Sequence, residues 1–346
     1  MYLYFFLFLL IVTLVIFFLS TRLNFAQDND FRKPQAIHSA RTARTLGIPL
    51  IFLTIFLIYN KHLLDETLLN ILIVSFMLSI VGLLEDLNFK INPYIRFFYQ
   101  VFFVTFSYSF FDLGQPLQTF DFLPSLLKNN TFMFIFTVIS ILTIANSINF
   151  IDGCNGLVIL YFIKIFIFLL LISLDNNLIN FFKYILIYLF IVIFFNFPKA
   201  KLFLGDFGAY YLGFLTSYLF IFISNSSIEF KIQINEWFLA IMFLYPSFEI
   251  FSTVLRRVLN KKSPFFPDNY HLHSLIYRVL ILAKFTDLFA NYSTSLIISL
   301  LNLIIILSLF YIPLELYVYF YFIFFASMYL VRFILVKLLN KLTLLA

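Results

Sequence analysis

Residues 146–157 read Asn-Ser-Ile-Asn-Phe-Ile-Asp-Gly-Cys-Asn-Gly-Leu, and they join two apolar runs at about 131–148 and 155–174. Either run is long enough to cross the hydrocarbon core of a bilayer, which takes about 20 helical residues. An unpaired polar side chain in that core costs several kcal/mol. Three Asn, one Asp and two Gly at this junction therefore indicate a polar site between membrane-spanning helices.

The composition argues against a soluble domain. Of the 346 residues, 63% are hydrophobic and only 12% are charged, whereas soluble domains carry about 25% charged residues. We therefore expect an all-α, polytopic integral membrane protein. The single Cys excludes an internal disulfide framework. The net charge of +6 does not require a nucleic-acid partner, and none is expected.

Apolar runs predict about eleven transmembrane helices if each crossing needs ~20 residues. They cover about 2–19, 45–60, 67–84, 94–111, 131–148, 155–174, 178–195, 207–224, 236–256, 292–311 and 314–336. The loop after the ninth run is expected to hold a short amphipathic helix near residues 272–282. No linker or repeat divides the chain, so we expect one membrane-embedded domain over residues 1–346.

Lys and Arg set the orientation, because cytoplasmic loops of membrane proteins carry an excess of them. If the N-terminus lies outside, the outer loops hold only Lys61, Lys128 and Lys231, while Lys164 and Lys183 fall inside predicted helices. This leaves 18 of the 23 basic residues in cytoplasmic segments. We therefore expect an outer N-terminus, a cytoplasmic C-terminus and a retained first helix rather than a signal peptide.

Four polar islands then face the cytoplasm, at residues 82–86, 146–157, 196–208 and 267–273. In the third island, Asp206 follows Gly205 just before a predicted helix. A carboxylate at this position suits a hard cation such as Mg²⁺. The alternative is that Asp206 is the N-cap of that helix, and the residue taken alone favours the cap.

Polar residues recur every three positions in the second island, at Asn146, Asn149, Asp152 and Asn155. A helical turn would align them along one face. Amides and a carboxylate on a common face can bind Mg²⁺, phosphate oxygens or the edge of a nucleobase. The alternative is polar contact between helices, which four such residues followed by a Gly make less favourable.

Two further pairs carry titratable groups. Glu85 and Asp86 place adjacent carboxylates at the inner end of the third predicted helix. Their repulsion requires a cation or basic groups nearby, unless the helix end is simply solvated. His271 and His273 are two residues apart, which suits a strand or extended loop that presents both to one side. Basic residues precede them and either attract phosphate or only orient the chain.

Carboxylates, amides, imidazoles and cations at one membrane face favour phosphate chemistry on a lipid. A transporter also carries buried polar groups between many helices. It would need these groups near the middle of the membrane, with paired broken helices in two halves. The islands of this chain gather at one face without repeat symmetry. These features disfavour a transporter, which remains the alternative from a different class.

Three motifs carry a family resemblance: the stretch 146–157, Gly-Asp-Phe-Gly-Ala at 205–209 with Asn196 upstream, and Pro-Phe-Phe-Pro-Asp-Asn-Tyr-His-Leu-His at 264–273. They closely resemble the polyprenyl-phosphate N-acetylhexosamine-1-phosphate transferases of glycosyltransferase family 4, which include the WecA-type and MraY-type membrane enzymes. The resemblance runs in order from about residue 28 to 278. The His-Leu-His form lies nearer to the WecA-type branch, which starts O-antigen or related glycans.

The resemblance implies a Mg²⁺-dependent phosphotransferase, with Mn²⁺ as an alternative metal. It would transfer an N-acetylaminosugar-1-phosphate from a UDP-N-acetylhexosamine to undecaprenyl phosphate and release UMP. This reaction starts a cell-envelope glycan. Members of the family lie in the lipid bilayer of the bacterial inner (cytoplasmic) membrane, with the active site on the cytoplasmic face. A homodimer is left open.

The resemblance also assigns roles to matching positions. The metal would be held by Asp206 and Asn149. The expected catalytic residues are Asp86, Glu85, Asp152, His271 and His273. The expected substrate-binding residues are Asn149, Gly153, Asn155, Asn196, Phe203, Arg257 and His38. In this scheme the nucleotide lies near Asp152 and Phe203, and the lipid phosphate lies near Asp86.

Three positions depart from the family pattern. Glu85 replaces the usual first Asp, Asn155 stands where many members have a second Asp, and Ser274 stands where the His run often continues. We therefore rank Asp86 above Glu85, and Asp152 above Asn155, as functional residues. The departures also leave open a catalytically impaired family member that acts as an assembly partner.

Overall fold

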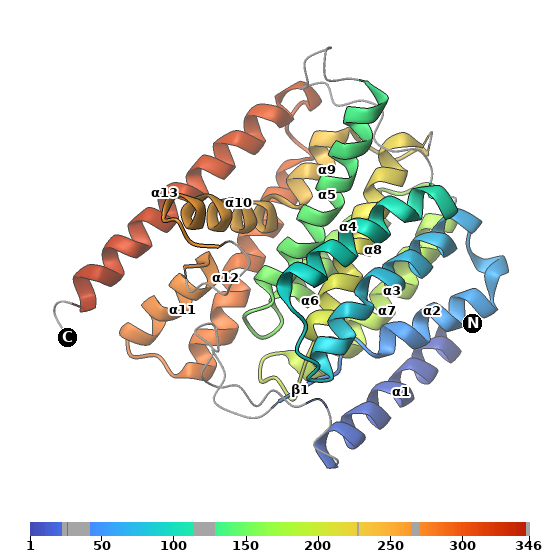
Figure 1. The fold of residues 1–346 in the computed structure, drawn as a ribbon, viewed down its shortest axis with the longest axis horizontal. Helices are drawn as coiled ribbons and strands as arrows, with labels where there is room; N and C mark the ends of the chain where they lie inside the picture. Colours follow the sequence, from blue (N-terminus) through green and yellow to red (C-terminus); the bar gives the residue numbers. More distant parts are fainter. Residues whose placement is uncertain are drawn as a thin grey trace.

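The structure is a computed structural model that describes residues 1–22, 26, 42–111, 113, 129–226, 228–263 and 270–343. This part of the chain is almost wholly helical (Figure 1). Its α-helices are α1 (Tyr2–Arg22), α2 (Pro49–Tyr59), α3 (Glu66–Asp86), α4 (Pro93–Phe110), α5 (Asn130–Ile151), α6 (Leu157–Ile172), α7 (Asn176–Asn196), α8 (Gly205–Asn225), α9 (Glu236–Met242), α10 (Leu244–Leu259), α11 (Leu272–Leu282), α12 (Asp287–Ser308) and α13 (Tyr317–Thr343). The strands are β1 (Ala43–Arg44) and β2 (Leu202–Phe203).

Polar side chains begin five of these helices. In each case the side-chain oxygen accepts a hydrogen bond from a backbone N–H in the first helical turn, at Asn92, Asn129, Asp175, Asn235 and Thr286. Such caps satisfy N–H groups that have no partner inside the helix. The polar caps therefore account locally for where these five helices start.

Seven of the described helices are long and apolar enough to cross a membrane, or eight if α9 and α10 form one bent span. Ten of the eleven predicted apolar runs coincide with one helix each, but α2 has only 11 residues and α6 only 16, and α4 is not among the seven. The amphipathic helix expected near residues 272–282 is α11. The all-α, polytopic prediction is confirmed, while the number of spans and their orientation stay predictions.

The predicted span 236–256 is not one straight helix. It is divided at Phe243 into α9 and α10, with a bend of 74°. Pro246 explains the break, because it has no N–H to donate to the carbonyl of Met242 and its ring would clash with that group. The Met242 carbonyl instead accepts a hydrogen bond from the Tyr161 hydroxyl on α6.

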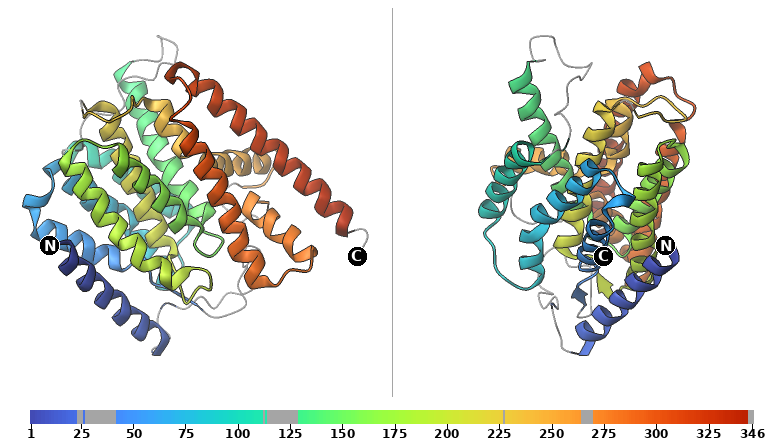
Figure 2. Two further views of the ribbon diagram at one scale, coloured as in Figure 1. Left: turned by 180° about the vertical axis from the view of Figure 1, so that it is seen from behind. Right: turned by 90° about the vertical axis from the view of Figure 1, so that its right-hand side faces the viewer.

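Helix α8 lies at the centre of the bundle and packs against α3 and α5 (Figures 1 and 2). Its membrane-length window is 89% buried, the largest share among the seven helices. Two glycines allow this packing. A Cβ at Gly82 would lie 2.7 Å from the backbone nitrogen of Phe207, and one at Gly213 would lie 2.7 Å from the Ala145 Cα. The C-terminal ends of α3 and α5 therefore meet the N-terminal end of α8 at backbone contact distance.

Strands β1 and β2 pair in parallel beside this junction, with Arg44 opposite Phe203. The pairing continues to Gly47, whose N–H donates to the Leu204 carbonyl at 3.0 Å. Gly47 also packs against α8, because a Cβ there would lie 2.6 Å from the backbone nitrogen of Gly208. The segment before α2 is thus fixed to the loop before α8, which brings Arg44 to the same junction.

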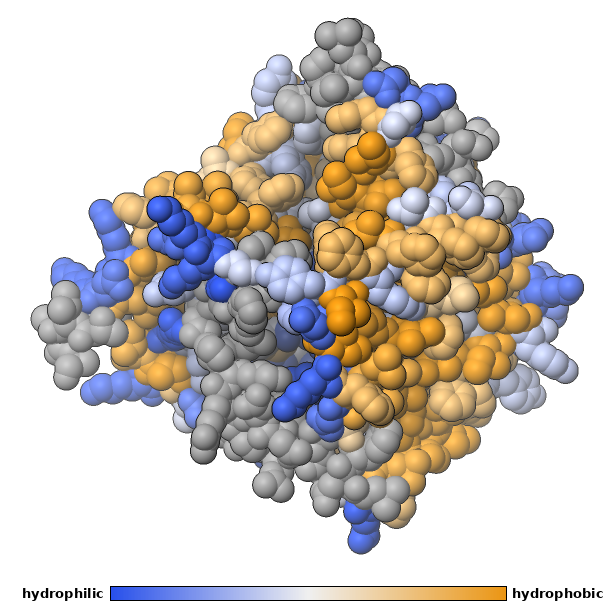
Figure 3. All heavy atoms as spheres, viewed as in Figure 1, coloured by the Kyte–Doolittle hydropathy of each residue, from blue (hydrophilic) through white to orange (hydrophobic). Residues whose placement is uncertain are grey.

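The outer surface is strongly apolar, as the broad orange areas in Figure 3 show for one face. Large hydrophobic side chains that are more than half exposed occur on α1, α4, α12 and α13, for example Leu3, Phe102, Leu300 and Ile323. Apolar patches of this extent are rare on soluble monomers. They suit contact with lipid acyl chains, which need no polar partner.

We expect Gly82→Val to destabilise the protein, because its side chain would meet the α8 backbone at 2.7 Å and force α3 away. Overpacking of this kind costs about 1–3 kcal/mol. The apparent melting temperature in detergent, followed by fluorescence size-exclusion chromatography, measures the loss. Leu84→Val, at an exposed position on the same helix, is the matched control. Equal melting temperatures for the two variants would contradict the close packing.

Candidate active site

Asp206 lies in the first turn of α8, where α3, α5 and α8 meet. The helix begins at Gly205, which has a φ of +79°, a conformation that glycine adopts without strain. The Asp206 carboxylate is partly exposed and accepts a hydrogen bond from Asn149 Nδ2 on α5 at 2.9 Å. The two residues predicted to share a metal are therefore in direct contact.

Asp86 caps α8 from a different helix. Its carboxylate is only 3% exposed and accepts hydrogen bonds from the backbone N–H groups of Asp206 and Phe207, both at 2.9 Å. N–H groups at a helix start lack partners within the helix, and a negative charge is favourable there. The cap position considered for Asp206 is thus filled by Asp86, which leaves the Asp206 carboxylate free of the helix backbone.

Glu85 occupies the more accessible position of the acidic pair. Its Oε2 forms an ion pair with Arg96 on α4 at 2.6 Å, and its carboxyl group lies within hydrogen-bonding reach of Asp206. Both Asp86 oxygens are already engaged by backbone N–H groups. Within the pair, Glu85 is therefore the carboxylate that the start of α8 does not engage, while the ranking of Asp86 above Glu85 as a functional residue stays a prediction.

Arg96 is a site residue that the sequence patterns did not indicate. It pairs with Glu85, and its guanidinium lies 5.7 Å from the centre of the Tyr210 ring on α8. A basic residue in the first turn of a helix opposes the helix dipole. Its position three residues after Pro93 was therefore the available signal that Arg96 has another partner.

Asp152 lies just beyond the end of α5, which closes at Ile151. The expected common face of four polar residues is therefore wrong for Asp152 and Asn155, because the helix has ended before them. Burial raises the pKa of Asp152 to about 7, and the negative charge of Asp206 adds to this effect while Arg44 opposes it. Asp152 thus belongs to the same electrostatic group as Asp206.

The amides of Asn155 and Asn196 bind other parts of the loops. Asn155 is buried, and its side chain donates to the Pro198 carbonyl at 2.9 Å. Asn196 is also buried, and it accepts from the Gly156 N–H and donates to the Leu202 carbonyl at 2.9 Å. These contacts fix the loop after α5 to the loop before α8. A role for either amide in nucleotide binding stays a prediction.

His271 and His273 lie together at the start of α11. Their rings are parallel within 4°, with centres 5.3 Å apart, and both side chains are buried. His271 is extended, but His273 is in the first helical turn, so the prediction of a strand or extended loop is wrong for His273. Burial, with the nearby His271 as a second cause, lowers the pKa of His273 to about 3. His273 is therefore neutral near pH 7.

Glu249 on α10 holds the histidine pair. Its side chain is fully buried, with Oε2 3.1 Å from His271 Nδ1 and Oε1 accepting from the Leu272 N–H at 2.7 Å. The Tyr245 hydroxyl, one turn earlier, lies 3.2 Å from His273 Nδ1. Glu249 was missed by the sequence patterns. Its signal was a carboxylate inside a predicted membrane span, which is costly without a specific partner.

Gly153 joins the acidic group to the histidines. A Cβ at Gly153 would lie 2.5 Å from His273 Nε2, so only glycine fits between this turn and the ring. Phe150 on α5 also meets the His271 ring, with centres 5.8 Å apart. The turn after α5 therefore contacts the histidines on one side and carries Asp152 toward Asp206 on the other.

The remaining predicted residues lie at the margin or outside the described chain. Phe203 is half-buried in β2. Arg257 Nε donates to the Ser263 carbonyl at 2.6 Å near the end of α10. His38 lies outside the described residues. Their roles in substrate binding stay predictions.

The oxygen groups around Asp206 fit a hard divalent cation. Among the described residues, no three His, Cys, Asp or Glu side chains gather as metal ligands. Glu85 and Asp206 nevertheless face each other beside the Asn149 amide, and two adjacent carboxylates repel unless a cation or proton lies between them. Mg²⁺ commonly needs only one or two protein carboxylates, because it keeps several waters and binds substrate phosphates.

The membrane-length helices define a polytopic membrane protein. Its centre is polar, and the carboxylates, amides, cations and imidazoles gathered there can accommodate phosphate groups. The sequence profile of glycosyl transferase family 4 matches residues 68–224, the segment that contains Glu85, Asp86, Asn149, Asp152 and Asp206. The matched segment is similar to this family, as the motifs of the chain predicted.

Two curated relatives extend the match beyond that segment. An undecaprenyl-phosphate alpha-N-acetylglucosaminyl 1-phosphate transferase of Thermotoga maritima is 28% identical over 298 residues, which cover 84% of this chain and 87% of the relative. A probable undecaprenyl-phosphate N-acetylglucosaminyl 1-phosphate transferase of Bacillus subtilis is 26% identical over 210 residues, or 58% of this chain and 55% of the relative.

We expect Asp86→Asn to lower the stability of the protein, because the new amide would direct a donor at a backbone N–H of α8. A buried donor left without a partner costs about 1–3 kcal/mol. The melting temperature in detergent measures this loss. Asp152→Asn is the matched control, since Asp152 lies beyond a helix end and its carboxylate accepts no backbone hydrogen bond in the described chain. If the melting temperature of Asp86→Asn is unchanged, the cap does not stabilise the protein, and Asp86 is again expected to act in the reaction.

Proposed function

We propose that this chain transfers an N-acetylaminosugar-1-phosphate from a UDP-N-acetylhexosamine to undecaprenyl phosphate, and so forms undecaprenyl-diphosphate-sugar and UMP. The observation that carries the proposal is the contact of Asp206 with Asn149 and Glu85, balanced by Arg96, at the start of a buried membrane helix. This is a site where two phosphate-bearing substrates and a divalent cation can meet.

The names of the two relatives support the acceptor and favour N-acetylglucosamine as the sugar. The motifs of the chain favour the WecA-type branch, which implies an initiating step in the synthesis of a cell-envelope glycan such as O-antigen. We assign the protein to the bacterial inner membrane with its site on the cytoplasmic face, because the excess of Lys and Arg lies on that side. Nucleotide sugars are available there.

In the proposed reaction, a phosphate oxygen of the lipid attacks the β-phosphorus of the nucleotide sugar. The bond from that phosphorus to the bridging oxygen breaks, and UMP leaves with the electron pair. A phosphate monoester has a second pKa of about 6, so the attacking oxygen is already deprotonated near neutral pH. The protein is therefore required mainly to hold two anions together in line.

The acidic junction would hold the metal. Asp206, with Glu85 and Asn149, supplies the oxygen ligands for Mg²⁺, or for Mn²⁺ in its place. When bound, the metal screens the negative charges of the two substrates. Arg96 pairs with Glu85, and Arg44 interacts electrostatically with Asp86 and Asp152. Both supply fixed positive charge that does not depend on the metal.

The histidine pair would orient a phosphate or sugar group. Glu249 accepts from the Leu272 N–H and meets His271 Nδ1, which leaves Nε2 of that ring for a substrate. His273 is neutral, and its Nε2 lies against the Gly153 turn. His273 therefore supports the turn that carries Asp152, while His271 is the better candidate for substrate contact.

Two alternatives remain for the same fold. A catalytically impaired family member would bind the nucleotide sugar without turnover, and the departures at Glu85 and Asn155 keep it open. A transporter is less favoured, because the described chain has a single broken span without a counterpart. A homodimer is compatible with the exposed apolar helices but is not required by the mechanism.

Purified protein with undecaprenyl phosphate, Mg²⁺ and UDP-N-acetylglucosamine should release UMP, and EDTA should abolish the release. We expect Asp206→Asn to reduce turnover by more than about 100-fold, since even outer-shell partners of a metal contribute 10–100-fold. Asp175→Asn is the matched control, because Asn caps α7 as well as Asp does. Substantial turnover by Asp206→Asn would falsify the metal assignment. Sugar binding without UMP release by the native chain would favour the impaired family member.

We expect Glu249→Ala to reduce turnover by roughly tenfold or more, because a hydrogen bond to a charged group contributes about 1.5–3 kcal/mol. The variant leaves His271 Nδ1 and the Leu272 N–H without their partner. UMP release at saturating substrates measures the effect. Glu236→Ala, at the start of α9, is the control for loss of a carboxylate elsewhere in the span. Equal turnover by both variants would remove Glu249 from the site.

A further inference from the structure

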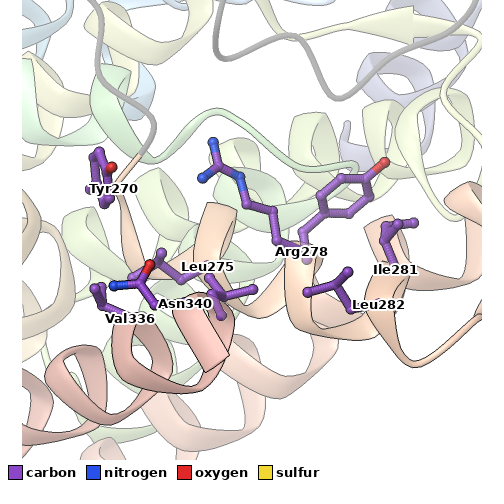
Figure 4. A pocket seen from close by; sticks show the side chains of 9 residues that line it. Tyr270, Leu275, Arg278, Ile281, Leu282, Val336 and Asn340 are labelled. Atoms are coloured by element: carbon purple, nitrogen blue, oxygen red, sulfur yellow. The ribbon is translucent and has the colours of Figure 1, made fainter. Parts of the chain in front are cut away.

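A second polar feature lies between α11 and α13, apart from the acidic junction. It is a cavity of about 330 Å³ (Figure 4). Its walls include Leu275, Arg278 and Leu282 from α11, and Val336, Leu339 and Asn340 from α13. We call it the α11–α13 groove. Residues 275, 278 and 282 follow helical spacing along one face of α11, whereas His273 points from a different face toward Gly153.

The groove carries a cation without an acidic partner. Arg278 makes no hydrogen bond or ion pair with any other residue that the structure describes, and Figure 4 shows its guanidinium extending away from α11 on the side where Tyr270 stands. Arg256 lies 5.1 Å from the centre of the Tyr270 ring. Arg332 lies one turn before Val336 on α13 and so shares its helix face.

Two carboxylates approach this region from neighbouring elements, and both have partners. Glu249 on α10 interacts with Arg332 but accepts hydrogen bonds from the α11 start. Asp287 on α12 accepts from the Tyr277 hydroxyl at 3.4 Å. Arg332 Nη1 is buried and has no hydrogen-bond partner among the described residues. The balance of charge around the groove is therefore positive.

The rest of the groove is apolar and continuous with a lipid-facing surface. Leu275, Leu282, Val336 and Leu339 supply its apolar walls. On the adjoining side of α13, the exposed residues are also hydrophobic, with Phe333 at 53% and Leu338 at 39% exposure. A molecule that fits both parts has an anionic head and a hydrocarbon chain, and it can enter laterally from the bilayer.

We propose that the α11–α13 groove binds one anionic phospholipid, with the headgroup phosphate on Arg278 and an acyl chain along Leu275, Leu282 and Val336. The bound lipid holds α11 against α13. Because α11 also carries His273 and follows His271, lipid binding fixes the histidine pair. This second consequence rests on the proposed transferase function, whereas the binding itself does not.

The binding is tested with full-length protein in detergent by native mass spectrometry. Phosphatidylglycerol and phosphatidylcholine of equal chain length are titrated in parallel. We expect retention of one phosphatidylglycerol and weaker retention of phosphatidylcholine. Arg278→Gln should weaken phosphatidylglycerol binding by about fivefold or more. Arg22→Gln, which removes an arginine at the end of α1, should leave it unchanged.

A second pair of variants tests the shape of the groove. Val336→Phe keeps Arg278 but fills the apolar part, so it should also weaken phosphatidylglycerol binding. Leu338→Phe, on the exposed side of α13, should not. Equal retention by Arg278→Gln and Arg22→Gln, or no effect of Val336→Phe, overturns the proposal. Displacement of phosphatidylglycerol by a small excess of undecaprenyl phosphate also overturns it, because the groove would then belong to the acceptor.

Turnover in nanodiscs separates the two proposals. With phosphatidylglycerol present, UMP release by the native chain should rise severalfold over phosphatidylcholine alone, and Arg278→Gln should lose this rise. If the lipid binds but no UMP is released, the proposed transferase function is wrong and the groove remains a lipid site. If UMP release does not depend on phosphatidylglycerol and this lipid does not bind, the lipid site is wrong and the transferase function stands.

Discussion

The hydrogen bonds from the start of α8 to the carboxylate of Asp86 are the contact on which the rest of the site depends. They fix the first turn of the central helix to the end of α3. The same geometry places Glu85, one residue earlier, beside Asp206 and Arg96. A charge buried between two helices is thus stabilised by a helix dipole and by N–H groups that would otherwise lack partners. Within one acidic pair, Asp86 holds the two helices together and Glu85 lies beside Asp206.

The helices could be predicted from the sequence because a helix that crosses a bilayer needs an apolar run of about 20 residues, which is visible in the sequence. The acidic motifs at the ends of α3 and α5 met the start of α8, since each lies at the end of an apolar run, and the turn after α5 also reaches His273. What local patterns could not show was which polar group meets which. Asp86 caps the start of α8, whereas Glu85 pairs with Arg96 on α4. Pro246 signalled the bend at Phe243. The sequence did not show that the Met242 carbonyl, which the proline leaves without a helical partner, accepts from the Tyr161 hydroxyl.

The site combines two electrostatic environments that differ in what they can hold. Around Asp206, carboxylates outnumber the cations, which suits a metal and its phosphates. At the histidine pair, both rings are buried, and burial lowers the pKa of His273 to about 3, so that this imidazole is neutral near pH 7. Gly153 connects the two, because only a residue without a side chain lets the turn after α5 touch an imidazole.

The cap between Asp86 and α8 joins residues 120 positions apart in the chain. At synthesis rates of 5–20 residues per second, roughly 6–24 s pass between the appearance of the carboxylate and that of its partner. During that interval the C-terminal end of α3 carries a carboxylate with no helix to cap. The contact that fixes the first turn of α8 therefore cannot form until the helices between α3 and α8 have been synthesised.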